Sequence, residues 1–345
     1  MNSKYDTGEK LADEAFSPCF FGVPKQDGIY QVSLEVTNRC NLRCMHCMNK
    51  SDDSASTVDG LPWEQMSVLL DEMAENNVKE LYITGGEPTL YSDFGKLVEK
   101  SKQLGMDTLL ATNAYDIEPY LDVIKKYVDI VFVSIDGSEI THNRFRCAPD
   151  AYGRTIANIK KMISYDIPVR LSTVISKNNK GDLENIIKEV CNMGVFRIHF
   201  TVLVNVGRAT NGSMQIDAIE YREISDIINN LKLKYEKNNF IITSRRSGKL
   251  DEFSEPCYGG QRMAHITASA MVSPCSYVSK CKLGEAYSIQ WEPGELKNCL
   301  EYIKKFQELC GKRKEYFGHH TCAALASISA GNSEIFAKDP LDIIW

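Results

Sequence analysis

The stretch Cys40-Asn-Leu-Arg-Cys44-Met-His-Cys47 places three cysteines within eight residues, and the rest of the chain is interpreted from it. It follows residues 30–36, an apolar run with the period of two that indicates a buried strand. Three thiolates on a loop that leaves a strand can each bind one iron of a [4Fe–4S] cube, which leaves the fourth iron open for a ligand. Zinc is the alternative, because Cys-x2-Cys spacing suits a tetrahedral site and His46 supplies a fourth ligand. The cysteines alone do not decide between the two.

The composition bounds the class of protein. A chain of 345 residues, 43% hydrophobic and 25% charged, is ordinary for one large globular α/β domain with a smaller appendage. Its net charge of −6 gives no electrostatic reason to expect nucleic acid or an acidic membrane as a partner. No apolar run approaches the ~20 residues of a membrane span, and the first residues lack the apolar core of a signal peptide. Twelve cysteines without a secretion signal then predict metal ligation in a reducing compartment, by default the cytoplasm.

Strands and amphipathic helices alternate after a mixed lead-in over residues 1–29. The pattern predicts strands at 30–36, 80–83, 107–111, 130–135, 169–175 and 196–202, and helices near 63–75, 93–104, 117–127, after 152 and after 182. Asp182 is the expected N-cap of the last of these helices, and Gly194 its end. Successive βα units predict a parallel sheet covered by helices, with functional loops at the C-terminal ends of the strands.

The pattern changes after Gly207. A helix is expected at 218–235 and a short strand at 240–243, and a cysteine-containing tail follows. We therefore expect a barrel domain over residues 30–243 and a C-terminal domain over residues 244–345, with the boundary within 244–256.

Two further motifs stand at expected strand ends. The second strand ends in Thr84-Gly85-Gly86-Glu87-Pro88, where two glycines let the backbone approach a ligand and Glu87 offers a carboxylate to an ammonium group. The fourth strand ends in Val133-Ser134-Ile135-Asp136-Gly137, where Ser134 and Asp136 are candidates for binding hydroxyl groups. Taken singly, the first also fits a plain turn and the second a capped strand end. Together with the cysteines they are more specific.

These residues resemble the radical S-adenosylmethionine (SAM) superfamily over about residues 31–209. The resemblance implies an α/β fold with a partial (βα)6 barrel, a catalytic [4Fe–4S] cluster on Cys40, Cys44 and Cys47, and SAM bound at Gly85-Gly86-Glu87-Pro88. It also implies Ser134 and Asp136 on the ribose side, His46 beside the adenine, Asn178 near the cofactor, and Arg146, in His142-Asn-Arg-Phe-Arg146, at the cofactor carboxylate. Gly207-Arg208-Ala209 resembles the sequence that closes the sixth unit in one large subgroup.

That subgroup has a cysteine-rich C-terminal extension of the SPASM or twitch kind, which holds auxiliary iron–sulfur clusters. The expected ligands in this chain are Cys257, Cys275, Cys310 and Cys322, with Cys281 in reserve and Cys299 also available. A full extension has a further dense run of cysteines that this chain lacks, so the resemblance implies one auxiliary [4Fe–4S] cluster and not two. Zinc is the alternative here too, and His319 and His320 are surface residues or neighbours of the metal.

Two residues depart from the family pattern, because Ala270 and Cys147 stand where the family usually has glycine. Cys147 is expected on a loop at the active-site end, where its thiol is a candidate hydrogen-atom donor to a substrate radical. The alternative for Cys147 is a small buried hydrophobe. Cys19 and Cys191 are expected to be structural.

The resemblance implies reductive cleavage of SAM to a 5′-deoxyadenosyl radical, which abstracts hydrogen from an unactivated position. Enzymes with this extension resemble maturases that crosslink, epimerise or oxidise ribosomally made peptides and proteins, so a peptide or protein substrate is expected. The alternatives are a small-molecule radical SAM dehydrogenase and a non-catalytic iron–sulfur or zinc protein.

The expected partners follow from this assignment. The first is a reductant such as flavodoxin or ferredoxin. The second is a separate leader-peptide-binding protein, which is expected because no peptide-recognition domain fits within the first 29 residues. Arg208, Arg245 and Arg246 are candidates for contacts with acidic leader residues, with a solvated surface position as the alternative. An extended peptide can bind by adding to a sheet edge.

Overall fold

The computed structural model describes residues 27–52, 54, 59–236, 240–244, 257–317, 322–331 and 333. Its first elements are β1 (Gln31–Glu35), α1 (Trp63–Glu75), β2 (Glu80–Thr84), α2 (Phe94–Gln103), β3 (Asp107–Thr112), α3 (Leu121–Tyr127), β4 (Ile130–Ser134), α4 (Glu139–Arg146), α5 (Ala151–Ser164), β5 (Val169–Ile175), α6 (Leu183–Val190), β6 (Arg197–Val202), α7 (Ala218–Tyr235) and β7 (Ile241–Ser244). These confirm the predicted strands and helices to within a few residues. The lead-in before residue 27, residues 245–256 of the expected boundary, and Cys19, Arg245, Arg246, His319 and His320 lie outside the described residues.

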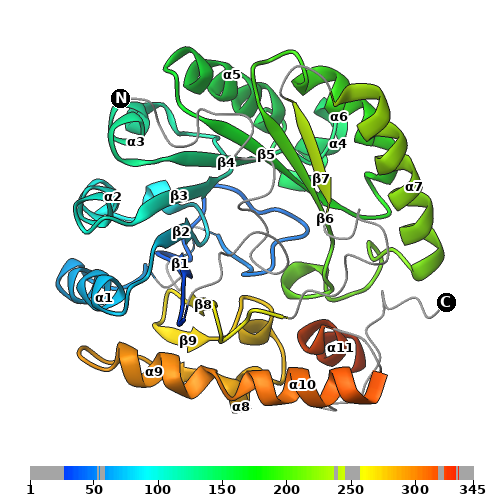
Figure 1. The fold of residues 1–345 in the computed structure, drawn as a ribbon. Helices are drawn as coiled ribbons and strands as arrows, with labels where there is room; N and C mark the ends of the chain where they lie inside the picture. Colours follow the sequence, from blue (N-terminus) through cyan, green and yellow to red (C-terminus); the bar gives the residue numbers. More distant parts are fainter. Residues whose placement is uncertain are drawn as a thin grey trace.

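The strands β1 to β7 form one parallel sheet in the order of the sequence. Figure 1 shows this sheet curving, with α1 to α7 around its outside. The central strands are apolar because both of their faces are covered, and β4 is buried over all but its last residue. The predicted α/β partial barrel is therefore confirmed. The short strand expected at 240–243 proves to be a seventh parallel strand, because β7 pairs with β6.

The C-terminal residues continue the same sheet from its other edge. Strand β8 (Met263–Ile266) pairs parallel with β1, and β9 (Met271–Ser273) and β10 (Ile289–Gln290) follow in antiparallel order. The helices of this extension are α8 (Gly284–Tyr287), α9 (Leu296–Ile303), α10 (Phe306–Phe317) and α11 (Ala323–Ala330), which lie along the lower side of the molecule in Figure 1. The expected division into two domains therefore does not coincide with a break in the sheet.

Two buried carboxylates fasten the extension to the barrel. Glu72 on α1 accepts hydrogen bonds of 2.9 and 2.7 Å from two backbone N–H groups at the start of α9. Glu35, the last residue of β1, lies 3.3 Å from His265 Nε2 on β8 and 3.2 Å from Lys280 Nζ. Burial opposes ionisation of Glu35, but His265 and Lys280 lower its pKa to about 2. Charge-assisted contacts thus reinforce the pairing of β1 with β8.

Two local features differ from the sequence-based expectations. Asp182 stands at the N-cap position of α6, but its side chain does not cap the helix. Its carboxylate instead accepts hydrogen bonds of 2.6 Å from the backbone N–H and the hydroxyl of Ser138, which follows β4. Helix α4 was not predicted; it carries His142 and Arg146 back toward the cysteine loop.

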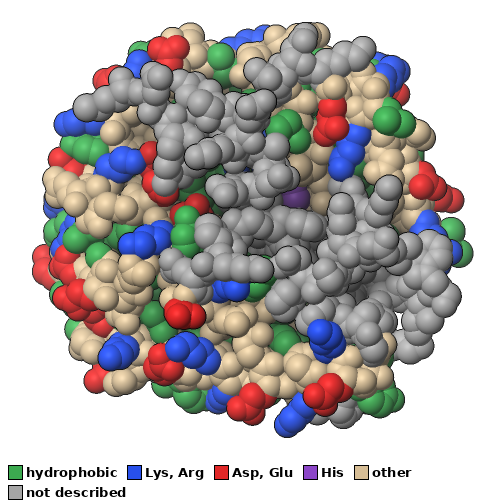
Figure 2. Space-filling model, in the orientation of Figure 1, with side chains coloured by type: hydrophobic (Ala, Val, Ile, Leu, Met, Phe, Trp, Pro, Cys, Tyr) green, Lys and Arg blue, Asp and Glu red, His purple; other side chains and the backbone are tan. Residues whose placement is uncertain are grey.

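The described surface carries charges of both signs. On the coloured part of the face in Figure 2, basic and acidic side chains are interspersed. With the net charge of −6, this part of the face offers no broad basic area of the kind that nucleic acid binding needs. Within the described ranges, no helix combines the length and the apolar character needed to cross a membrane.

Candidate functional site

The cysteine stretch forms a loop after β1, at the C-terminal end of the parallel sheet. Cys40 and Cys44 are buried, Cys47 is partly exposed, and all three belong to one packed cluster. Two side chains donate toward their sulfurs, with Asn113 Nδ2 at 3.8 Å from Cys40 Sγ and Arg146 Nη1 at 3.7 Å from Cys44 Sγ. Burial raises the pKa of the Cys40 thiol to about 12. A bound metal reverses such a shift, because a coordinating thiol is deprotonated.

This loop carries buried polar atoms that have no hydrogen-bond partner among the described residues. They are Asn38 Oδ1, His46 Nδ1, Asn49 Oδ1 and Ser51 Oγ. Leaving one such atom unpaired costs about 1–3 kcal/mol. A loop with several of them fits a polar ligand, and the amino, carboxylate and ribose groups of SAM have the chemistry to satisfy them.

The arrangement of the thiols is compatible with a cube. Within the described part of the chain, no three His, Cys, Asp or Glu side chains converge on one metal position. A tetrahedral zinc ion needs such convergence, whereas each thiolate of a cube binds a different iron. His46, the candidate fourth zinc ligand, has its Nε2 3.6 Å from Asp136 Oδ2.

The two glycines at the end of β2 make room for the cysteine loop itself. Gly86 N donates to Thr37 O at 2.7 Å, and Glu87 N donates to Arg39 O at 2.8 Å. A Cβ would lie 2.3 Å from Thr37 O at Gly85 and 2.1 Å from Arg39 O at Gly86. The structure thus gives a second reason for these glycines, because their nearest neighbour is the loop backbone. The expected close approach of a ligand stays a prediction.

The Glu87 carboxylate is occupied by donors from its own turn and from β3. Its Oε1 accepts from the hydroxyls of Thr112 (2.7 Å) and Thr89 (2.9 Å), and its Oε2 accepts from Asn113 N (2.9 Å). Burial raises the pKa of Glu87, and these hydrogen bonds oppose the rise. The expectation that this carboxylate binds an ammonium group stays a prediction, and the contacts seen give Glu87 a second role in positioning Asn113. Asn113 was not among the expected site residues, although it lies two residues after a predicted strand.

Gly207 and Arg208 hold the loop from its other side. Arg208 donates from Nε to Cys44 O (2.8 Å), from Nη2 to Ser51 O (2.7 Å) and from its backbone N to Cys47 O (3.0 Å). Gly207 has φ +64°, and a Cβ there would lie 2.2 Å from Cys47 O. These contacts were not among the expectations for Arg208, and its contact with an acidic leader stays a prediction. Its guanidinium spans the loop that carries the three cysteines.

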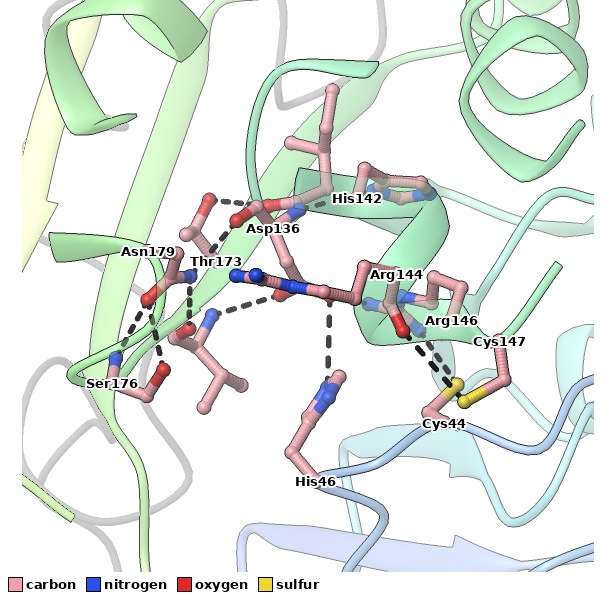
Figure 3. Close-up of polar contacts among 12 residues, drawn as sticks. Cys44, His46, Asp136, His142, Arg144, Arg146, Cys147, Thr173, Ser176 and Asn179 are labelled. Carbon is pink, nitrogen blue, oxygen red and sulfur yellow. Dashed lines mark hydrogen bonds and ion pairs between the residues drawn. The ribbon is translucent and has the colours of Figure 1, made fainter. Parts of the chain in front are cut away.

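Asp136 and Arg146 form a buried ion pair, and Figure 3 shows the arginine between Asp136 and Cys44. Arg146 Nη2 lies 2.6 Å from Asp136 Oδ2. Burial opposes ionisation of Asp136, but the charge of Arg146 lowers its pKa. Burial likewise opposes the charge on Arg146, yet Asp136 raises its pKa. In this structure each charged group is the partner of the other, and the expected contacts of Asp136 with ribose and of Arg146 with a cofactor carboxylate stay predictions.

Two histidines contact the same aspartate. His46 Nε2 approaches its carboxylate, and the His46 ring lies 5.2 Å from the Phe145 ring, centroid to centroid. His142 Nδ1 accepts a hydrogen bond of 3.2 Å from Asp136 N. Burial lowers the pKa of His46 to about 4 and that of His142 to about 3. Both rings are therefore neutral near pH 7, and His46 adds an uncharged, flat surface to the loop.

Asn179, and not Asn178, is the asparagine that reaches this aspartate. Asn179 is buried, its Nδ2 donates to Asp136 O (2.8 Å), and its Oδ1 accepts from Ser176 N (2.7 Å), as Figure 3 shows. Asn178 is exposed, and its backbone carbonyl accepts a hydrogen bond from an arginine of α4. Ser134 ends β4 and is half-buried, at the expected strand end.

Cys147 ends α4 in the left-handed conformation, with φ +55°. That backbone conformation explains the glycine expected at this position, and Ala270, with φ +64°, has the same explanation. The Cys147 thiol is exposed and donates to Arg144 O at 3.7 Å. The alternative of a buried hydrophobe is therefore wrong for Cys147.

The C-terminal cysteines gather in a second packed cluster. It contains Cys257, Cys275, Cys281, Cys310 and Cys322, together with apolar side chains from the turn at 278–280, α10 and α11. Cys299 lies elsewhere, in the main core, where its Sγ donates to Gln290 O at 3.7 Å. The structure thus brings together the four expected ligands and the reserve cysteine, and it excludes Cys299.

Comparison with known proteins agrees with this geometry. A family model described as the radical SAM superfamily matches residues 34–190. The AdoMet-dependent heme synthase of Methanosarcina barkeri (strain Fusaro / DSM 804) is 26% identical, over 81% of this chain and 87% of its own. The sporulation killing factor maturation protein SkfB of Bacillus subtilis (strain 168) is 26% identical, over 70% of this chain and 59% of its own.

Solved structures share the fold over most of the chain. Streptococcus suis SuiB bound to S-adenosylmethionine has a TM-score of 0.72 and 17% identity, covering 92% of this chain and 78% of that one. The protein anSMEcpe with bound AdoMet has a TM-score of 0.68 and 16% identity, covering 89% of this chain and 94% of that one. The cysteine loop, the adjacent strand ends and the family match lead to one conclusion: residues 34–190 form a radical SAM domain, the kind of domain that works with S-adenosylmethionine and a [4Fe–4S] cluster.

Proposed function

We propose that this radical SAM enzyme belongs to the SPASM or twitch subgroup and modifies a ribosomally made peptide or protein. The observation that carries the proposal is the cluster of five cysteines on an extension that continues the barrel sheet. SuiB bound to the precursor peptide SuiA shares the fold over 92% of this chain, with a TM-score of 0.72. By its name, SkfB matures a killing factor.

The residues of the cysteine loop would hold the cofactors. Cys40, Cys44 and Cys47 would bind the catalytic cluster. When bound, the cluster and SAM supply the one-electron cleavage of a carbon–sulfur bond that starts radical chemistry. The Gly85-Gly86-Glu87-Pro88 segment would meet the amine of SAM. Ser134, His46 and Asn178 are the proposed neighbours of the nucleoside part.

The surrounding residues keep this loop in place. Arg208 bridges the two ends of the loop, and the Asp136–Arg146 pair buries a charge against Cys44. Glu87 ties the end of β2 to the end of β3. A fixed arrangement of this kind aims the reacting groups and excludes water, which is the contribution that a protein makes to cofactor chemistry.

The extension would hold the auxiliary cluster. Cys257, Cys275, Cys310 and Cys322 are the proposed ligands, and Cys281 is the reserve. We also propose an external electron donor of the flavodoxin or ferredoxin class. A separate leader-peptide-binding protein completes the proposed set of partners.

Iron content and cofactor cleavage test the two metal sites. A Cys40/Cys44/Cys47→Ala variant, reconstituted without oxygen, should keep about four irons, the content of one cube, and form no 5′-deoxyadenosine. Cys310→Ala should lose auxiliary-cluster iron, while Cys299→Ala, the matched control in the main core, should not. Continued cofactor cleavage by the triple variant, or equal iron in the two single variants, would contradict the assignment.

Mass spectrometry tests the substrate. The reconstituted enzyme is incubated with SAM, a reductant and each short peptide encoded beside its gene. Loss of two hydrogens would indicate a crosslink or oxidation, and deuterium uptake from heavy water would indicate epimerisation. If no peptide changes while a small molecule is consumed, the peptide assignment is wrong.

A small-molecule substrate is the second candidate, and a specific observation favours it. The similar heme synthase of Methanosarcina barkeri is matched over 87% of its length, a larger share than the 59% of SkfB. Its name indicates a tetrapyrrole substrate and not a peptide. Adding a carboxylated porphyrin to the same assay separates the two candidates.

A further inference from the structure

A pocket of about 520 Å³ lies where the cysteine loop meets the C-terminal extension. Its lining residues come from 48–50, which directly follow Cys47, from 205–210 after β6, and from 280–285 and 327–331 of the extension. One wall therefore belongs to the loop of the catalytic cysteines and another contains Cys281. The pocket therefore lies between the segment that follows Cys47 and the segment that carries Cys281.

The charged residues in the lining are mostly basic. Lys50, Lys280 and Lys282 all line the pocket, and Glu285 is the one carboxylate among its described lining residues. Uncharged polar side chains, including Asn49 and Asn205, complete the polar part of the wall. Such a lining suits an anion with several acceptor oxygens.

The three lysines differ in how firmly they are held. Lys280 Nζ lies 3.2 Å from the buried Glu35, which fixes this ammonium group in place. Lys282 pairs with Glu285 at 3.2 Å, but both side chains are mostly exposed, and an exposed pair contributes only about 0–1 kcal/mol. Lys50 is exposed and has no ion-pair partner among the described residues. Lys50 and Lys282 can therefore turn to a ligand at little cost.

Asn49 adds an independent indication of a ligand. Its Nδ2 donates to Gly85 O at 3.3 Å, which holds the side chain against the end of β2. Its Oδ1 is buried and has no partner among the described residues, so it is open to an N–H or O–H donor of a ligand. The pocket thus combines exposed ammonium groups, which suit a carboxylate, with an amide oxygen that can accept from a donor elsewhere on the same ligand.

We infer that this pocket binds a carboxylate group of the substrate, with Lys50 and Lys282 as its partners. The inference rests on the proposed function and deepens it, because it names the chemical feature by which the substrate is held. Acidic side chains of a peptide and the carboxylate arms of a small molecule present the same chemistry. A substrate anchored here is held beside the loop that carries the catalytic cysteines.

Equilibrium binding to the full-length, anaerobically reconstituted chain tests the inference without requiring turnover. The probes are dye-labelled hexaglutamate, its hexaglutamine counterpart, and coproporphyrin III, a small molecule with carboxylate arms; fluorescence anisotropy or intensity reports binding. The variants are Lys50→Glu and Lys282→Glu. Lys297→Glu is the matched control, because it makes the same charge change at an exposed position of α9 that does not line the pocket.

Each charge reversal in the pocket should weaken binding of the carboxylate probe about five- to tenfold, and Lys297→Glu should leave it within about twofold. Binding of hexaglutamate with this pattern supports the pocket and an acidic peptide. Binding of coproporphyrin alone with this pattern supports the pocket but contradicts the peptide substrate. Equal weakening by all three variants, no preference over hexaglutamine, or no binding of either carboxylate probe overturns the inference.

Discussion

Replacing Arg208 with alanine is expected to loosen the cysteine loop while the barrel stays folded. The side chain makes hydrogen bonds of 2.8 Å to Cys44 O and 2.7 Å to Ser51 O. A hydrogen bond from a charged donor contributes about 1.5–3 kcal/mol net. Because Arg208 itself is partly exposed, water can enter the space it leaves in the variant, and we take the lower value for each bond. The loop should then open more easily by about 3 kcal/mol, or about 150-fold in its opening equilibrium.

Hydrogen exchange read by mass spectrometry measures this opening on the full chain with its thiols reduced and no metal added. The informative peptides cover residues 40–52, where Cys40 N bonds to Asp52 O and Met45 N to Phe145 O. Their protection should fall by up to about 150-fold in Arg208→Ala, and peptides from β4 should be unchanged. Arg208→Lys should lie between, because one ammonium group does not span both carbonyls as the guanidinium fork does.

Arg43→Ala is the matched control, because Arg43 is an exposed arginine on the same loop. It should leave the protection within about threefold. Unchanged exchange of residues 40–52 in Arg208→Ala would refute the reasoning, as would equal acceleration in Arg43→Ala. The same pair of variants separates a clamp from a leader-binding arginine, since the leader-binding role predicts no change in the free enzyme.

Three further predictions follow from individual contacts. Gly86→Ala should lower the free energy of unfolding by about 1–3 kcal/mol in a urea titration, because its Cβ would lie 2.1 Å from Arg39 O. Gly95→Ala is the control and should not destabilise the protein, because the nearest atom to its Cβ lies at 3.9 Å. Equal stability of the two variants would contradict this prediction. Glu35 has its pKa lowered from 4.5 to about 2, so its contribution of about 3 kcal/mol is present above pH 4.5 and is lost as the pH falls toward 2. Glu35→Gln should therefore lose less stability than the parent over that range in urea titrations, and parallel losses would show that the reasoning is wrong. Cys147→Ala and Cys147→Gly both remove the exposed thiol, and glycine also suits the left-handed backbone. If the thiol donates hydrogen, both variants should cleave SAM but stall or divert the product, and normal product formation would leave Cys147 with a purely structural role.

The sequence by itself determined the elements and the positions of the motifs. Periods of two and 3.6 residues located the strands and helices, because the alternation of buried and exposed positions is a local property. The cysteine spacing and the glycines at strand ends are local too, and a parallel sheet brings its C-terminal strand ends to one edge. The triad at the end of β1 and the serine at the end of β4 were therefore predictable.

The tertiary structure alone decided which groups are partners. Asp136 pairs with Arg146 because an unpredicted helix, α4, turns the arginine back toward the strand end. Glu87 faces β3, and Arg208 reaches the cysteine loop from β6, because strand order and curvature set those approaches. Periodicity assigns each residue to an inner or outer face but does not encode which distant residue meets it there. For the same reason, five cysteines from separate turns and helices come together while Cys299, on a helix nearby in sequence, is packed into the main core.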